Sequence, residues 1–168
     1  MARARPRPRW PDASSVRSLP NRLLVSLLAQ ALPEEEMLPK LHILVASDDY
    51  ETREYLQDVL HNLGHDVGSV GTVPLLLNLC RTLEPDVVFA ETRVGTPDAS
   101  EAAVQVNREK ALPFILIGDD DEGERLVRKG ADCVVAYIAK PLNQAKVEEA
   151  LLLAERWLRR LKDAREQA

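Results

Sequence analysis

The feature that most constrains the fold is a set of four short apolar runs, each ending at a polar or small residue. The central run follows Pro85-Asp86, contains four consecutive apolar residues and ends at Glu91. Such runs are typical of strands that are buried on both faces, as in parallel sheets. The carboxyl ends of parallel strands line the crevice where α/β proteins bind ligands. The candidate functional residues are therefore those at the run ends: Asp48, Asp49, Glu91, Gly118 and Lys140.

Helical patterns alternate with the apolar runs along the chain. Thr72 is placed to cap one helix, and Gly64 and Gly130 are placed to end two others. Five strand–helix units predict an α/β fold with a five-stranded, parallel, doubly wound sheet. The expected strands are 41–47, 66–70, 86–90, 114–117 and 134–138, and the expected helices are 50–63, 73–83, 100–110, a helix ending near 129, and 143–166.

The formal charge of −5 is unevenly distributed along the 168 residues. Residues 1–36 carry six basic and four acidic side chains, a net +2, and the remainder carries 16 basic and 23 acidic ones, a net −7. An acidic domain argues against DNA or RNA binding by the folded part. With no apolar run of membrane-spanning length and no secretory signal pattern, we expect a cytoplasmic protein without membrane contact. Cys80 and Cys133 are expected to be buried free thiols.

The composition divides the chain into three parts. Residues 1–36 form an Arg/Pro-rich arm that we expect to be disordered, with a short helix near 21–32. This arm is either a solvated tail or a basic segment that contacts nucleic acid or an anionic membrane. Residues 40–155 form the folded domain, and residues 156–168 extend its last helix. We hypothesise that Met37 is the true initiator, because it lies just before the first strand, where the folded domain naturally begins.

The last helix is longer than the predicted sheet requires. Its apolar residues recur at spacings of four and three, which is a coiled-coil pattern of about two heptads. Two interpretations stay open: the pattern forms a dimer or partner surface, or its first half covers the sheet and the rest is a frayed tail. The residues concerned are Val147, Leu151, Ala154, Leu158 and Leu161, with Trp157 beside them.

Residues 41–155 resemble a receiver domain of a bacterial two-component response regulator, a flavodoxin-like fold. The motifs that carry the resemblance are Ile-Leu-Val-Ala-Ser-Asp-Asp at 43–49, Leu-Glu-Pro-Asp-Val-Val-Phe-Ala-Glu at 83–91, Pro-Phe-Ile-Leu-Ile at 113–117 and Ala-Tyr-Ile-Ala-Lys-Pro-Leu at 136–142. The last motif and the long final helix are similar to receivers of antitermination-type regulators. No three-helix RNA-binding output follows them in this sequence.

The resemblance implies roles for the residues at the strand ends. Acidic residues after the first strand hold Mg²⁺ in the family, which here implies Asp48 and Asp49 together with Glu91. Glu91 occupies the phosphoacceptor position, where the family has Asp. The family's switch and phosphate-binding positions are Gly118, Tyr137 and Lys140 in this chain. The resemblance also implies a cis peptide bond between Lys140 and Pro141.

Three departures from the family pattern shape the expected function. Glu replaces the phosphoacceptor Asp at Glu91, Ser47 replaces the first acidic residue, and Gly118 replaces a Thr or Ser. The longer Glu91 side chain should pair directly with Lys140 rather than form a stable acyl phosphate. Without a hydroxyl at Gly118, the coupling of a phosphoryl group to Tyr137 is lost. Magnesium binding should be weak or lost, because the site lacks one carboxylate.

Several of these residues also have a purely structural interpretation. In this interpretation Asp48 and Asp49 only stabilise the start of the helix 50–63, and residues 119–122 stabilise the start of the next-to-last helix. Tyr137 is alternatively a fixed packing residue. The three histidines lack metal-ligand spacing and are expected at the surface or at its boundary: His42, His61 and His65.

We therefore expect a non-enzymatic, phosphorylation-independent receiver that acts through protein contacts, either with a signalling partner or as a homodimer. The expected surface combines the helix ending near 129, strand 134–138 and helix 143–166. One alternative is a working Mg²⁺-dependent phosphoacceptor, which needs Asp86 or Asp98 in place of Glu91. The other is a flavin- or nucleotide-binding enzyme, which is disfavoured because no Gly-rich loop follows a strand and no catalytic triad is recognisable.

Overall fold

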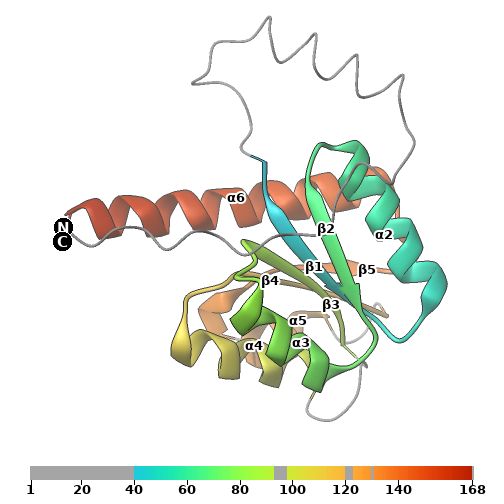
Figure 1. The fold of residues 1–168 in the computed structure, drawn as a ribbon, viewed down its shortest axis with the longest axis horizontal. Helices are drawn as coiled ribbons and strands as arrows, with labels where there is room; N and C mark the ends of the chain where they lie inside the picture. The colour runs from blue at the N-terminus through green and yellow to red at the C-terminus, as the bar shows by residue number, and fades with distance from the viewer. Residues whose placement is uncertain (1–39, 93–97, 120–122, 130, 168) are drawn as a thin grey trace, which may run out of the picture.

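The computed structural model describes residues 40–92, 98–119, 123–129 and 131–167. Within these ranges five parallel strands form one sheet in the order β2-β1-β3-β4-β5 (Figure 1). The order places β1 in the interior, with later strands added on one side, so the predicted doubly wound parallel sheet is confirmed. The strands are β1 (His42–Ala46), β2 (Asp66–Val70), β3 (Val87–Glu91), β4 (Phe114–Gly118) and β5 (Val134–Ala139).

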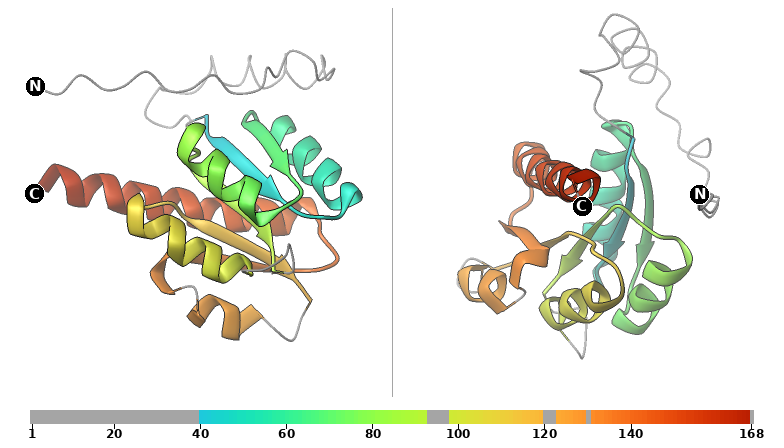
Figure 2. Two further views of the ribbon diagram at one scale, coloured as in Figure 1. Left: turned by 60° about the horizontal axis from the view of Figure 1, so that its bottom comes forward. Right: turned by 90° about the vertical axis from the view of Figure 1, so that its left-hand side faces the viewer.

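Helices cover both faces of the sheet (Figure 2). One face carries α2 (Tyr50–Asn62) and α6 (Gln144–Gln167), and the other carries α3 (Val73–Thr82), α4 (Ala99–Glu109) and α5 (Gly123–Lys129). A short 3-10 helix, η3 (Ala131–Cys133), leads into β5 and was not predicted from the sequence. The predictions for the arm over 1–36, its helix near 21–32 and the start at Met37 concern residues outside the described ranges.

The sheet separates two apolar clusters, because successive side chains of each strand point to opposite faces. Phe89 and Ile115 pack with α2 and α6 on one side, and Phe114 and Leu116 pack with α3 and α4 on the other. Every residue of β3 and of β4 is buried. Burying a side chain of this size stabilises the fold by about 1.5–3 kcal/mol. The position of Glu91 at the end of β3 is therefore fixed by one of the best-packed strands.

Local signals at the helix ends agree with the sequence. Thr72 caps α3 by accepting a hydrogen bond from the backbone N–H of Leu75, as predicted. Gly64 follows α2 with a φ of 97°, a conformation that favours glycine over residues with a Cβ. Asp98 caps α4 by accepting a hydrogen bond from the Glu101 N–H at 2.9 Å.

One histidine prediction is wrong. His65 is buried, with 4% of its surface exposed, rather than lying at the surface. Its Nδ1 accepts a 3.0 Å hydrogen bond from the backbone N–H of Leu41. Burial penalises the charged imidazolium and lowers the pKa of His65 to about 4. The burial of His65 was not predictable from the sequence, because no apolar pattern surrounds this residue. Its hydrogen-bond partner, Leu41, is 24 residues away.

The start of α6 covers the sheet, which supports one of the two interpretations of this long helix: that its first half packs on the domain. Val147, Leu151 and Ala154 are buried in the core beside the sheet, and Leu158 packs partly against it. These residues are therefore used within the domain and do not form an exposed coiled-coil seam. The C-terminal part of α6 continues past the sheet (Figure 1).

Both cysteines are buried and form no disulfide, as predicted. Burial raises the pKa of the Cys80 thiol to about 12 and also raises that of Cys133. Both thiols are therefore protonated at neutral pH and poorly reactive. Among the helices of the described ranges, none combines the length and the apolar character needed to cross a membrane.

Candidate functional site

The strand ends that the sequence singled out meet at one edge of the sheet. Strand register pairs Ala46 with Ala90, and Gly118 with Ala139, so the residues that follow these pairs lie side by side. A backbone hydrogen bond from the Lys140 N–H to the Gly118 carbonyl, 2.9 Å long, ties the end of β5 to that of β4. The expected convergence is present, and the chemical roles of the residues stay predictions. The peptide bond between Lys140 and Pro141 is cis, as expected.

Glu91 and Lys140 form an ion pair at this edge. Lys140 Nζ lies 2.5 Å from Glu91 Oε1, with side-chain exposures of 36% and 10%. The buried carboxylate is thus compensated by a cation that reaches it from the more exposed side. A charged pair in this setting is stronger than a surface salt bridge, because water screens it less. The sequence predicted this pair from the extra methylene of Glu relative to Asp.

At the end of β1, one of the two acidic residues caps a helix and the other is exposed. Asp49 caps α2, where its carboxylate accepts hydrogen bonds from the Thr52 hydroxyl at 2.7 Å and from the Glu51 N–H at 3.3 Å. The Thr52 hydroxyl is the main cause that lowers the pKa of Asp49, and the nearby Lys140 adds to it. Asp48 is exposed. The structural interpretation of Asp49 as a helix cap is therefore the one that the contacts support.

A cation also approaches the carbonyl at the end of β1. Arg53 Nη1 donates a 2.6 Å hydrogen bond to the backbone oxygen of Ser47. Ser47 is fully buried, and its hydroxyl accepts a hydrogen bond from the Asp49 N–H at 3.0 Å. The loop after β1 is thus stabilised by the Ser47 hydroxyl and by the Arg53 guanidinium.

The Gly118 position is filled by its neighbours. A Cβ at Gly118 would lie 2.7 Å from the Tyr137 hydroxyl oxygen and 2.8 Å from Thr92 Oγ1, both shorter than real contacts of this kind. The Tyr137 hydroxyl donates a hydrogen bond to the backbone oxygen of Asp119. The Tyr137 ring also crosses Gly123, where a Cβ would lie 2.6 Å from its Cε1. Two glycines therefore make the room in which Tyr137 lies against the sheet end.

The side chains do not fit the magnesium site that the family resemblance implies. Asp48 is exposed, Asp49 caps a helix, and Glu91 contacts an ammonium group. In the part of the chain that the structure describes, no group of three or more His, Cys, Asp or Glu side chains is placed to hold a metal ion. The Lys140 ammonium group supplies the positive charge beside Glu91 that a metal ion would otherwise bring. Weak or lost magnesium binding stays a prediction.

The two aspartates that might replace Glu91 as phosphoacceptors lie elsewhere. Asp86 Oδ2 accepts a hydrogen bond from the His42 N–H at 2.9 Å, at the opposite end of β3. Asp98 caps α4 and also accepts a 2.6 Å hydrogen bond from the Ser100 hydroxyl. The acidic run 119–122 lies mostly outside the described ranges, and only its first residue, Asp119, is described.

No role in the site was assigned from the sequence to four residues: Thr52, Thr92, Gly123, and Arg53 as a hydrogen-bond donor to the Ser47 carbonyl. Thr92 directly follows Glu91, so the alternation of side chains along a strand places it on the other face, toward Tyr137. The role of Thr92 could therefore have been predicted from this alternation. Gly123 had no comparable signal, because its partner Tyr137 is 14 residues away in another element.

Comparisons with known proteins agree with this geometry. The family described as flagellar regulatory protein FleQ matches residues 42–156. No curated protein matches the chain. Solved structures with the same fold include chemotaxis protein CheY4 of Vibrio cholerae, which is 15% identical with a TM-score of 0.61 over 68% of this chain and 98% of that one.

Two further structures are similar to this chain. The signal receiver domain of an HD domain-containing protein from Pseudomonas fluorescens is 18% identical, with a TM-score of 0.67 over 79% of this chain and 98% of that one. A CheY-like response regulator receiver domain from Methylobacillus flagellatus is 19% identical, with a TM-score of 0.61 over 69% of this chain and 99% of that one. At these identities the likeness establishes the fold.

Proposed function

Because the chain belongs to the family of the flagellar regulatory protein FleQ and has the fold of a signal receiver domain, we propose that it is a receiver module that phosphorylation does not switch. It regulates a signalling partner through protein contacts and catalyses no reaction. The observation that carries this proposal is the ion pair between Glu91 and Lys140.

The first step, phosphoryl transfer, needs a reactive carboxylate and a cation that offsets the crowded negative charge. The Glu91 carboxylate has 10% of its side-chain surface exposed and contacts Lys140 Nζ at 2.5 Å. A phosphoryl donor would have to displace this ammonium to reach the carboxylate. The carboxylates that would hold a compensating metal are exposed or engaged in capping.

The second step, the response of the domain, needs a group that moves when the site changes. In this chain the Tyr137 hydroxyl and Thr92 Oγ1 already border the space beside Gly118. Tyr137 is further fixed by its hydrogen bond to Asp119 and by its contact with Gly123. With this ring packed in place and no hydroxyl at Gly118, the domain keeps one arrangement. A fixed arrangement is suited to constant partner binding.

The surface that we assign to partner contacts is formed by α5, β5 and α6. β5 is an edge strand of the sheet, and α6 continues beyond the sheet with mostly exposed residues. Trp157 on α6 and the exposed Leu153 place apolar area on this face. Exposed apolar area next to charged side chains is typical of protein-binding surfaces.

Backbone amide spectra of the ¹⁵N-labelled chain test the proposal. We expect the resonances of Gly118, Thr92 and Tyr137 to stay in place when Mg²⁺ and a small-molecule phosphodonor are added together. A new set of resonances at these positions that appears only with both reagents would contradict it. Any shift that occurs with the donor alone at high ionic strength serves as the baseline.

A further inference from the structure

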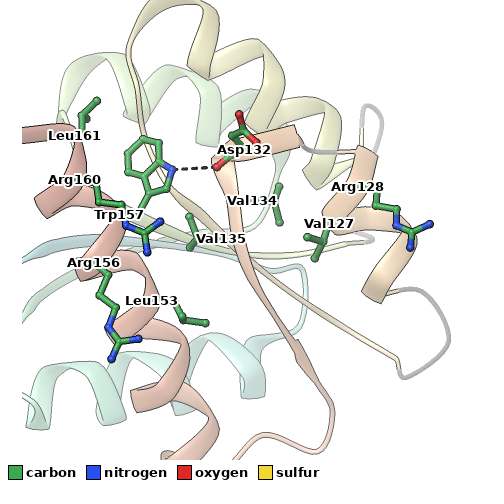
Figure 3. A pocket seen from close by; sticks show the side chains of 10 residues that line it. All are labelled: Val127, Arg128, Asp132, Val134, Val135, Leu153, Arg156, Trp157, Arg160 and Leu161. Atoms are coloured by element: carbon green, nitrogen blue, oxygen red, sulfur yellow. Dashed lines mark hydrogen bonds between the residues drawn. The ribbon is translucent and has the colours of Figure 1, made fainter. Parts of the chain in front are cut away.

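A groove of about 790 Å³ lies beside the edge strand β5, between α5 and α6 (Figure 3). We call it the arginine groove. Apolar side chains from three elements line it, including Val127, Val135 and Leu153, and Leu153 is 40% exposed. Three arginines border it: Arg128, Arg156 and Arg160.

The arginine groove has a positive charge in an otherwise acidic domain. Asp132 is its one acidic lining residue, so three arginines against one aspartate give a net +2. Trp157 Nε1 donates a 3.0 Å hydrogen bond to the Asp132 backbone oxygen, which fixes the indole in the groove (Figure 3). Tryptophan and arginine around apolar area are the side chains enriched at the centres of protein interfaces. The groove is thus suited to an acidic, partly aromatic protein surface.

The chain itself presents such a surface on α2. Glu51, Glu54, Tyr55 and Asp58 follow the spacing i, i+3, i+4 and i+7, so they share one helix face. All four are exposed, and Tyr50 beside them is 65% exposed. We call these five residues the acidic stripe. The neighbouring cation, Arg53, donates to the Ser47 carbonyl, and its Cζ lies over the Tyr50 ring, 5.9 Å from the ring centroid.

The two surfaces lie at opposite edges of the sheet. The acidic stripe is on α2, which packs against the edge strand β2, and the arginine groove is beside the other edge strand, β5. One copy therefore cannot cover its own groove with its own stripe. Two grooves facing each other would bring arginine against arginine, which disfavours a symmetric dimer through this face.

We propose that the arginine groove of one copy binds the acidic stripe of a second copy, giving head-to-tail association of the chain. The proposal rests on the partner surface assigned under the proposed function and names a second copy as its occupant. The carboxylates of Glu54 and Asp58 face Arg156 and Arg160, and the tyrosines cover the apolar floor. Contacts of this kind are heterologous, so association continues beyond a dimer as concentration rises.

Sedimentation velocity on the full chain tests the proposal with two complementary variants. The groove variant carries Arg156→Glu and Arg160→Glu, and the stripe variant carries Glu54→Gln and Asp58→Asn. The wild type should associate in a concentration-dependent way, less so at high salt, because ions screen exposed charges. Each variant alone should associate about tenfold or more weakly.

Mixing the two variants gives the decisive result. The groove variant keeps an intact stripe, and the stripe variant keeps an intact groove, so the mixture forms one good interface. We expect a 1:1 complex that grows no further. The control variant carries Arg108→Glu and Lys162→Glu, which change the net charge of the chain as much as the groove variant does, at exposed residues outside both surfaces. It should associate like the wild type.

Three outcomes would overturn the proposal: a wild type that stays monomeric at all concentrations, a groove variant that associates as the wild type does, or a mixture without the 1:1 complex. A wild-type dimer that does not grow and is insensitive to both variants indicates a symmetric contact elsewhere. Circular dichroism of each variant verifies its fold. These outcomes leave the phosphorylation test untouched, so failure of self-association is distinguishable from failure of the proposed function.

Discussion

Lys140 Nζ lies 2.5 Å from Glu91 Oε1, which joins the end of β5 to that of β3 across the intervening strand β4. The proposed function assigns Glu91 to the phosphoacceptor position of a receiver domain and Lys140 to the position of the lysine that binds the phosphoryl group. Its carboxylate is mostly buried, and its ammonium is about one-third exposed. The pair therefore has both a structural and a functional consequence, and the two can be measured separately.

The structural consequence is a stability cost when one partner is removed. Lys140→Gln should lower the free energy of unfolding by about 1–3 kcal/mol, because it leaves the Glu91 carboxylate without its cation. Glu91→Gln with Lys140→Gln should recover part of that loss. Urea unfolding of the four chains of this double-mutant cycle gives the coupling, which we expect at about 1–2 kcal/mol. A coupling near zero would show that the pair contributes nothing to stability.

Magnesium binding provides an independent test of the same pair. Lys140 Nζ competes with any cation for Glu91 Oε1, so the wild type should gain little thermal stability from Mg²⁺. Lys140→Gln frees this oxygen and should bind Mg²⁺ more tightly than the wild type. The double variant with Glu91→Gln should lose that gain. Isothermal titration calorimetry measures all three, and equal affinities would refute competition by Lys140.

Crowding at Gly118 predicts a steric cost. Gly118→Ala places a Cβ 2.7 Å from the Tyr137 hydroxyl oxygen and should destabilise the domain by about 1–3 kcal/mol. Tyr137→Phe removes that oxygen, so Gly118→Ala should cost less in this background. Gly71→Ala is the matched control, because its Cβ would lie 3.3 Å from Arg53 Nη1, a longer contact that a shift of a few tenths of an ångström relieves. If Gly118→Ala and Gly71→Ala cost the same in thermal unfolding, Tyr137 is not held as described.

The buried His65 predicts a loss of stability in acid. Its pKa is about 4 in the folded chain, against 6.5 for an ordinary histidine. Between these values the unfolded chain binds a proton that the folded chain does not, so stability rises with pH there. The contribution is fully present above about pH 6.5 and falls by up to about 3 kcal/mol as the pH approaches 4.

Urea unfolding of the wild type and of His65→Asn between pH 7 and pH 4 measures this contribution. The Asn side chain offers an oxygen near the position of Nδ1 for the Leu41 N–H. We expect a weaker pH dependence for His65→Asn than for the wild type. His61→Gln, on the last turn of α2, is the matched histidine substitution outside the buried core. Identical slopes for all three chains would contradict the assignment.

The fold was predictable because its signals are local. The apolar runs ending at Glu91 and Gly118 identify buried parallel strands, and Thr72 and Gly64 mark helix ends within a few residues of themselves. The pair between Glu91 and Lys140 was predictable from side-chain length once the strands were placed. Glu91 ends β3 and Lys140 directly follows β5, and β4 is the one strand between these two in the sheet.

The site was less predictable where its contacts join distant residues. Gly118 was interpreted as a lost hydroxyl, whereas the structure shows its space bordered by the hydroxyls of Tyr137 and Thr92. Nothing in the sequence links Gly123 to the Tyr137 ring, or Leu41 to His65. Such contacts depend on tertiary packing, which residue spacing along the chain does not encode.

Intact-mass spectrometry after incubation with Mg²⁺ and a small-molecule phosphodonor tests the central claim most directly. A conventional receiver domain in the same mixture serves as the positive control, and Glu91→Asp reports whether the shorter carboxylate alone restores acceptance. The account predicts no acid-labile adduct on the wild-type chain, because Lys140 pairs with the Glu91 carboxylate and the described part of the chain places no carboxylate set to hold the metal. A clear phosphoryl adduct on the wild type, mapped to Glu91 or to another carboxylate at the sheet edge, would contradict it.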